Sequence, residues 1–107
     1  MVEEISATEL KRLIDGGGNV QMIDVREPGE FSFAKIPGTK LIPLGEIISR
    51  MKELDPTREA IIICKMGGRS ARAIEALKAY GYTGQLRNLG GGITAWSNDV
   101  DPTVPKY

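Results

Sequence analysis

The sequence contains no histidine and only one cysteine among its 107 residues. Without histidine the chain has no cysteine–histidine nucleophile pair, no serine–histidine–aspartate triad and almost none of the usual zinc-ligand sets. We therefore expect neither a metal nor a cofactor. A lone cysteine cannot form an internal disulfide, which is typical of a reducing compartment, so we expect a cytoplasmic location. Any chemistry must come from this thiol, carboxylates, lysine, arginine and backbone N–H groups.

An excess of charge and long apolar runs are lacking as well. Fourteen Lys and Arg balance 14 Asp and Glu, so the formal net charge is zero. Nucleic-acid and membrane-surface partners normally require a basic excess, and we expect neither. No apolar run approaches the roughly 20 residues of a membrane span. The acidic start, residues 1–4, does not resemble a signal peptide.

The length and composition indicate a single globular domain. A chain of 107 residues is close to the commonest domain size, and its hydrophobic fraction of 41% is ordinary. There is no internal repeat and no segment that reads as a linker. We expect residues 1–107 to form one domain.

Hydrophobic periodicity predicts helices that alternate with short strands. Residues 20–25 and 60–63 are typical of buried strands, 41–42 is a brief strand candidate, and 85–89 is a last one. Amphipathic helices are predicted over 45–54 and over 70–80, where Ala73, Ile74, Leu77 and Tyr80 share one side. Shorter helices are expected after a capping box at Ser6, from Pro28, and around residues 93–96. This alternation predicts an α/β fold with a parallel sheet.

Two polar features follow strands of that sheet. Asp24 and Arg26 lie at the end of residues 20–25, and Cys64 directly follows residues 60–63. Ligands of parallel sheets bind at the carboxyl ends of the strands. Asp24 could position the site, or could simply accept backbone N–H groups of the next turn. For Arg26 the simplest interpretation is an ion pair with Glu30.

The segment Cys64-Lys65-Met66-Gly67-Gly68-Arg69-Ser70 combines three features that favour a thiolate. Its glycines permit a turn whose backbone N–H groups point inward. The predicted helix places its positive N-terminal end nearby, and Lys65 and Arg69 add full charges. A lone cysteine after three isoleucines is also often a small buried core residue. The glycine pair and the two cations favour the reactive interpretation.

Several motifs together resemble the rhodanese homology domain, in the order of that family. They are Asp24–Phe31, Ile36-Pro37-Gly38, Ile42-Pro43, Cys64–Ser70 and Leu89–Trp96. The resemblance implies a three-layer sandwich of about five mostly parallel strands flanked by helices. It also implies a sulfurtransferase, in which Cys64 accepts sulfane sulfur from a small donor such as thiosulfate or from a protein persulfide. By the same resemblance, the loop that cradles this persulfide consists of Lys65, Met66, Gly67, Gly68, Arg69 and Ser70.

The tail, residues 95–107, is similar to the C-terminal rhodanese domain of MoeB/ThiF-type adenylyltransferase-sulfurtransferases. That likeness implies a role in molybdopterin or thiamine biosynthesis, with a sulfur-carrier protein or an adenylyltransferase domain as partner. Cyanide or a thiol is the alternative acceptor. The chain departs from the family at Ala34-Lys35, where Gly-His is frequent, and at Leu41, where Asn is frequent. These departures affect the outer substrate surface.

Two other functions fit part of this pattern. Cysteine phosphatases and arsenate reductases use a similar loop, but five residues separate their cysteine from the arginine. Here only four residues separate Cys64 from Arg69, and the shorter loop suits a sulfur atom better than a phosphate. A non-catalytic interaction module with the same fold is the second alternative, although such modules commonly lack the cysteine.

Overall fold

The computed structural model describes residues 2–107, which form one five-stranded sheet in the order β1-β5-β4-β2-β3. All four strand pairs are parallel. The strands are β1 (Glu4–Ile5), β2 (Val20–Asp24), β3 (Thr39–Leu41), β4 (Glu59–Ile63) and β5 (Leu86–Leu89). The predicted α/β class, with about five mostly parallel strands, is confirmed.

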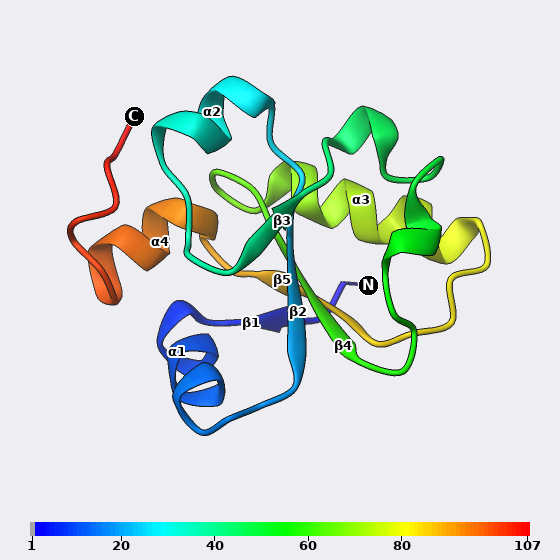
Figure 1. Cartoon of the computed structure of the whole chain (residues 1–107), viewed down its shortest axis with the longest axis horizontal. Coiled ribbons are helices and arrows are strands. Elements are labelled where there is room, and N and C mark those ends of the chain that lie inside the picture. The colour runs from blue at the N-terminus through cyan, green and yellow to red at the C-terminus, as the bar shows by residue number, and fades with distance from the viewer. Residues whose placement is uncertain (1) are drawn as a thin grey trace.

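Four α-helices and two 3₁₀ turns surround the sheet (Figure 1). They are α1 (Ala7–Asp15), α2 (Pro28–Phe33), α3 (Gly68–Ala79), α4 (Gly92–Asp99), η1 (Leu44–Glu46) and η2 (Met51–Glu53). In Figure 1, α1 and α4 lie to the left of the central strands, and α3 lies mostly to the right. None of the helices within residues 2–107 has the length and apolar character needed to cross a bilayer.

The central strand β4 is covered on both faces, as its continuous apolar run predicts. Ile61 and Ile63 belong to a core cluster with residues of α1 and α4, whereas Ala60 and Ile62 pack with residues of α3. All four side chains have no exposed surface. This alternation is the two-residue period of a strand, and it divides the core into two layers.

Local signals position the ends of the helices. Ser6 Oγ accepts from the Glu9 backbone N–H at 3.1 Å, and Glu9 Oε1 accepts from the Ser6 N–H, also at 3.1 Å. The predicted capping box of α1 is therefore confirmed. Pro28 begins α2, where its missing N–H costs nothing.

The helix predicted over residues 45–54 is wrong. The segment forms η1, a turn and η2, with contacts between residues three apart such as Ile47 N to Leu44 O. Ile47 and Leu54 are nevertheless buried. Short 3₁₀ turns bury the same apolar residues without a continuous helix, since their side chains also recur about every third residue.

Three smaller differences concern one side chain, one helix start and one edge strand. Tyr80 does not join the apolar side of α3; its side chain is 65% exposed. α3 begins at Gly68, two residues before the predicted start. The edge strand β1 was not predicted, because two residues carry no periodic signal.

The sheet register brings the polar features after β2 and β4 together. Asp24 pairs with Ile63 across the two strands, and Val25 N donates to Ile63 O at 2.9 Å. Cys64, the residue after β4, therefore leaves the sheet beside Asp24 and Arg26. This edge holds the candidate site.

Candidate active site

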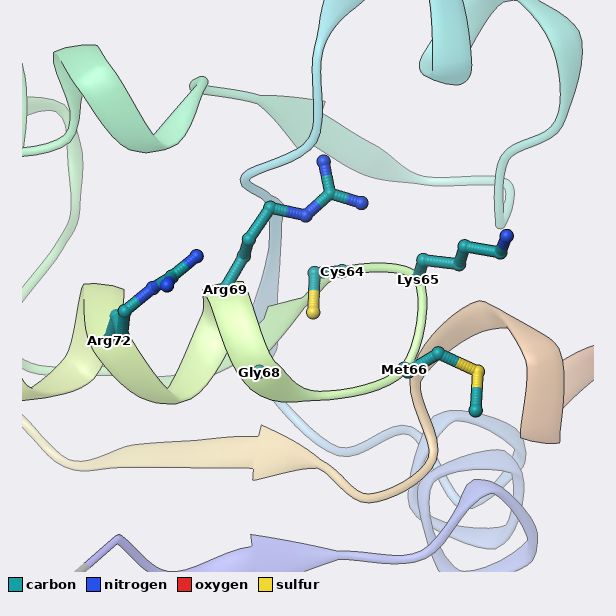
Figure 2. Close-up of a pocket in the computed structure, with 6 residues that line it drawn as sticks. All are labelled: Cys64, Lys65, Met66, Gly68, Arg69 and Arg72. Carbon is teal, nitrogen blue, oxygen red and sulfur yellow. The ribbon is translucent and has the colours of Figure 1, made fainter.

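The loop after β4 turns sharply around the side chain of Cys64 (Figure 2). Gly67 has φ of +111°, a left-handed conformation that favours glycine, and α3 begins at the next residue. An open cavity of about 330 Å³ lies against this loop, lined by Cys64, Lys65, Met66, Gly68, Arg69 and Arg72. The glycine turn thus produces the inward-facing loop that the sequence predicts.

The sulfur of Cys64 receives hydrogen bonds from the loop itself. Gly67 N–H donates to Sγ at 3.0 Å, and Ser70 Oγ lies 3.2 Å from Sγ. Burial raises the pKa of the Cys64 thiol. Hydrogen bonds from the Ser70 hydroxyl and from the backbone N–H groups of Ser70, Gly67 and Met66 lower the same pKa by a larger amount. The net result is a Cys64 pKa below its ordinary value, which favours the thiolate.

Ser70 has one hydroxyl proton and three neighbours that can accept it. Besides the Cys64 sulfur, these are Asn88 Oδ1 and the Gly67 carbonyl. The Nδ2 group of Asn88 donates to Gly67 O at 2.9 Å, which turns Oδ1 toward Ser70. In the thiol form Cys64 S–H can donate to Ser70, and Ser70 to Asn88. In the thiolate form the Ser70 proton can turn to the sulfur.

The two predicted cations do not point at the sulfur. In Figure 2, Lys65 and Arg69 extend away from the Cys64 Sγ atom. Arg69 forms two hydrogen bonds with the Glu30 carboxylate, at 2.6 and 2.9 Å. The Lys65 ammonium lies 4.6 Å from the centre of the Tyr107 ring. Direct contacts to the sulfur therefore come from backbone N–H groups and Ser70.

The Arg69–Glu30 pair connects the loop to α2. Hydrogen bonds from Arg69 lower the pKa of Glu30 to about 2. Tyr107 adds a hydrogen bond from its hydroxyl to Glu30 Oε2 at 2.7 Å. Glu30 is thus ionised at neutral pH and held on two sides.

Asp24 and Arg26 form a buried ion pair behind the loop. Arg26 Nη2 and Asp24 Oδ2 are 2.7 Å apart, and both side chains are at most 1% exposed. Asp24 Oδ1 also accepts the Arg26 backbone N–H at 3.0 Å, which is the structural role considered for it. The predicted ion pair between Arg26 and Glu30 is wrong. Asp24 pairs with the Arg26 guanidinium because the two residues lie close together where β2 ends, and Glu30 contacts Arg26 only through its backbone carbonyl.

The start of α4 supports the loop from the other side. Ile93 N–H donates to Cys64 O at 2.9 Å, and Thr94 N–H to Lys65 O at 3.2 Å. A Cβ atom on Gly92 would overlap both of these carbonyl groups, and Gly92 has φ of +59°. The glycine run before α4 is therefore a site of close backbone packing.

Three residues of the site escaped the sequence analysis, and a fourth, Glu30, was assigned the wrong partner. Glu30, Asn88 and Tyr107 reach the loop from distant parts of the chain, and no local signal indicates their contacts. Arg72 could have been found, because it lies three residues after Arg69 on the same face of a predicted helix. Within residues 2–107 no group of three acidic, cysteine or histidine side chains is arranged to hold a metal ion.

Comparison with known proteins identifies the family. Residues 6–99 match the family described as Rhodanese-like domain. A sulfurtransferase of Allochromatium vinosum is 36% identical over 104 residues, which cover 97% of this chain and 96% of that protein. The probable adenylyltransferase/sulfurtransferase MoeZ of Mycobacterium tuberculosis is 37% identical over 105 residues, which cover 96% of this chain but 26% of MoeZ. The chain spans about a quarter to a third of the longer curated relatives that it matches.

Solved structures agree with this match. The rhodanese-like domain protein from Staphylococcus aureus superposes with a TM-score of 0.83 at 31% identity, over 99% of both chains. The likeness covers the sheet, the helices and the loop after β4.

Proposed function

This chain belongs to the rhodanese-like family of sulfurtransferases, and we propose that Cys64 carries the transferred sulfur as a persulfide. The observation that supports this role most directly is the set of hydrogen-bond donors aimed at Sγ. Gly67 N–H and the Ser70 hydroxyl lie 3.0 and 3.2 Å from the sulfur. Donors in these positions stabilise negative charge on a thiolate, and the inward-facing loop offers the same polarity to the outer sulfur of a persulfide.

The reaction has two steps. The Cys64 thiolate attacks the sulfane sulfur of thiosulfate, the sulfur–sulfur bond of the donor breaks, and sulfite leaves with the bonding electron pair. A nucleophile such as cyanide then attacks the outer sulfur of the persulfide, and the Cys64 thiolate is the leaving group. Each step conserves charge. The thiolate and the thiosulfate dianion give a persulfide anion and the sulfite dianion, and the persulfide anion and cyanide then give the thiolate and the thiocyanate anion.

The acceptor in this scheme is external. Cys64 is the only cysteine, so no second thiol of the chain can resolve the persulfide. We propose cyanide or a small thiol as simple acceptors, and a sulfur-carrier protein or adenylyltransferase domain as protein partner. Relatives named as a putative sulfur carrier protein and as MoeZ support this class of partner. Within the same proposal, residues 1–107 act as one domain, in the cytoplasm, in molybdopterin or thiamine biosynthesis.

Roles for the other residues follow from their contacts. We assign persulfide binding to the loop, with Gly67 and Ser70 donating to sulfur. Lys65, Met66, Gly68 and Arg69 form its walls. Asp24 and Arg26 support the loop from the neighbouring strand rather than contacting substrate.

The test is the formation of thiocyanate from thiosulfate and cyanide. The wild-type chain is expected to produce thiocyanate, and Cys64→Ser is expected to lose the activity while keeping its circular dichroism spectrum. Ser49→Ala, on an exposed turn away from the loop, serves as a matched control that keeps the activity. A Cys64→Ser variant as active as the wild type would refute the proposal.

A further inference from the structure

The charged residues that line the cavity beside Cys64 are all cations. Three of its six lining residues, Lys65, Arg69 and Arg72, are positively charged, and the other three are uncharged or the thiol itself. A cavity with this lining attracts an anion. The three cations are not equally available, however, and their contacts distinguish them.

Arg69 and Lys65 are already engaged. Both Nη groups of Arg69 donate to Glu30, whose negative charge neutralises that of the guanidinium. The Lys65 ammonium sits over the Tyr107 ring, on the other side of the loop from α3. Recruiting either of them for a substrate would require breaking a contact that the protein itself supplies.

Arg72 is not engaged in this way. It lies one helical turn after Arg69 on α3, and in Figure 2 the two side chains extend side by side from the helix. Arg72 is exposed at the mouth of the cavity, and no residue among 2–107 forms an ion pair or a side-chain hydrogen bond with it. Its planar group offers a pair of parallel N–H donors, a geometry that matches two oxygens of one oxyanion.

We propose that Arg72 is the anion-binding residue of this cavity and holds the oxyanion end of a sulfane-sulfur donor, the sulfonate oxygens of thiosulfate or of an organic thiosulfonate. The inference rests on the proposed function. With the sulfonate at Arg72, the sulfane sulfur faces Cys64. The guanidinium offsets the repulsion between the thiolate and the dianionic donor. The Arg72 guanidinium also stays beside the sulfite dianion as it leaves. Its role is therefore confined to the step in which the persulfide forms.

The experiment compares two donors in the wild type, Arg72→Gln and Arg72→Lys. Thiosulfate carries a sulfonate group, whereas the persulfide of 2-mercaptoethanol carries an uncharged hydroxyethyl group in its place. Losing one charge-assisted contact should raise KM for thiosulfate about tenfold in Arg72→Gln, with little change in kcat. KM for this persulfide, which has no sulfonate group, should stay unchanged. The thiosulfate KM of Arg72→Lys should lie between those of the wild type and Arg72→Gln, because lysine keeps the positive charge but lacks the pair of parallel N–H donors.

Lys78→Gln is the matched control, since Lys78 is an exposed cation in the last turn of the same helix and does not line the cavity. It should keep the wild-type KM for both donors. An unchanged thiosulfate KM in Arg72→Gln would overturn the inference. An equal rise for both donors would overturn it too, because the effect would then not depend on the sulfonate.

A binding measurement separates this inference from the proposed function. In a Cys64→Ala background thiosulfate cannot react, and calorimetry should show its affinity fall about tenfold when Arg72→Gln is added. Equal affinities would overturn the role of Arg72 even if sulfur transfer is observed. A wild-type Cys64 that accepts sulfur from neither donor would instead overturn the proposed function, while a loss of thiosulfate affinity would still support Arg72 as the anion-binding residue.

Discussion

At the scale of single residues, the Ser70 hydroxyl proton and the backbone N–H groups of the loop together favour the thiolate of Cys64. Ser70 can give that proton to the sulfur or to Asn88, and the Asn88 side chain is oriented by its own bond to Gly67 O. The thiolate is therefore stabilised by a neutral donor that can turn toward it as charge develops. Lysine and arginine, the residues that the sequence suggests for this role, contact Tyr107 and Glu30 instead.

Ser70→Ala is expected to raise the pKa of Cys64. The variant loses the side-chain hydrogen bond that lowers this pKa, whereas burial, which raises it, remains. The rate of thiol alkylation should therefore reach half its maximum at higher pH than in the wild type, and be lower at neutral pH. Ser49→Ala should keep the wild-type profile. A Ser70→Ala profile that matches the wild type would show that the backbone N–H groups alone set the Cys64 pKa.

The buried Asp24–Arg26 pair predicts a large and non-additive stability effect. Removing either partner leaves an uncompensated buried charge, and Arg26→Ala or Asp24→Ala should each cost about 3–5 kcal/mol in the free energy of unfolding. The double variant should lose less than the sum of the two, because neither charge is then left alone. Urea unfolding measures all three. The exposed Lys11–Asp15 pair is the control, and Lys11→Ala should cost under about 1 kcal/mol. Additive losses at Asp24 and Arg26 would contradict the pairing.

At the scale of elements, the loop is fixed by contacts with its neighbours. α3 continues it, and the first N–H groups of α4 bond to its Cys64 and Lys65 carbonyls. Helix N-termini have unpaired N–H donors, and here α4 uses them on the backbone of the loop. The active loop therefore keeps its shape only while α4 stays close.

Gly92→Ala should disturb both stability and sulfur transfer. The new methyl group would overlap the Cys64 and Lys65 carbonyls, and alanine is strained at φ of +59°. We expect a loss of about 1–3 kcal/mol in the free energy of unfolding and a lower rate of thiocyanate formation. Gly29→Ala is the matched control, since its Cβ would meet no atom within 4 Å. A fully active Gly92→Ala with wild-type stability would show that the loop tolerates displacement of α4.

The elements also show what the sequence can predict. Ile61 to Ile63 predict a central strand correctly, because consecutive β-branched apolar residues are typical of a strand covered on both faces. Residues 45–54 have apolar side chains at the spacing of an amphipathic helix, yet they form 3₁₀ turns. Periodicity near three residues does not distinguish an α-helix from turns that bury the same side chains. Cys64, Gly67 and Ser70 were found because the turn and its donors are local in the chain.

At the scale of the whole molecule, distant segments converge on the loop. Glu30 lies 39 residues from Arg69, and Tyr107 lies 77 residues from Glu30. Such pairs depend on how the sheet brings α2, α3 and the tail together, so no local pattern could predict them. For the same reason the sequence suggests Glu30 as partner of the nearby Arg26, whereas the fold gives it to Arg69.

Acid should weaken the fold through Glu30. Its pKa falls from 4.5 to about 2 in the folded protein because Arg69 donates to it. A depressed carboxylate pKa contributes stability above pH 4.5, and this contribution is lost as the pH falls through about 2. Between these values the free energy of unfolding of Glu30→Gln should fall less steeply than that of the wild type. Urea unfolding across this range measures both slopes.

Glu75→Gln, an exposed change on α3, is the control for this measurement and should keep the wild-type slope. Equal slopes in Glu30→Gln and the wild type would contradict an ion pair between α2 and α3.

The most direct test of the central claim is the intact mass of the protein after treatment with thiosulfate. The account predicts that the wild-type chain gains one sulfur atom on Cys64, that cyanide removes it, and that Cys64→Ser gains none. Peptide mapping locates the added sulfur. A wild-type chain whose mass does not change would contradict the assignment of Cys64 as a sulfur carrier, as would an equal gain by Cys64→Ser.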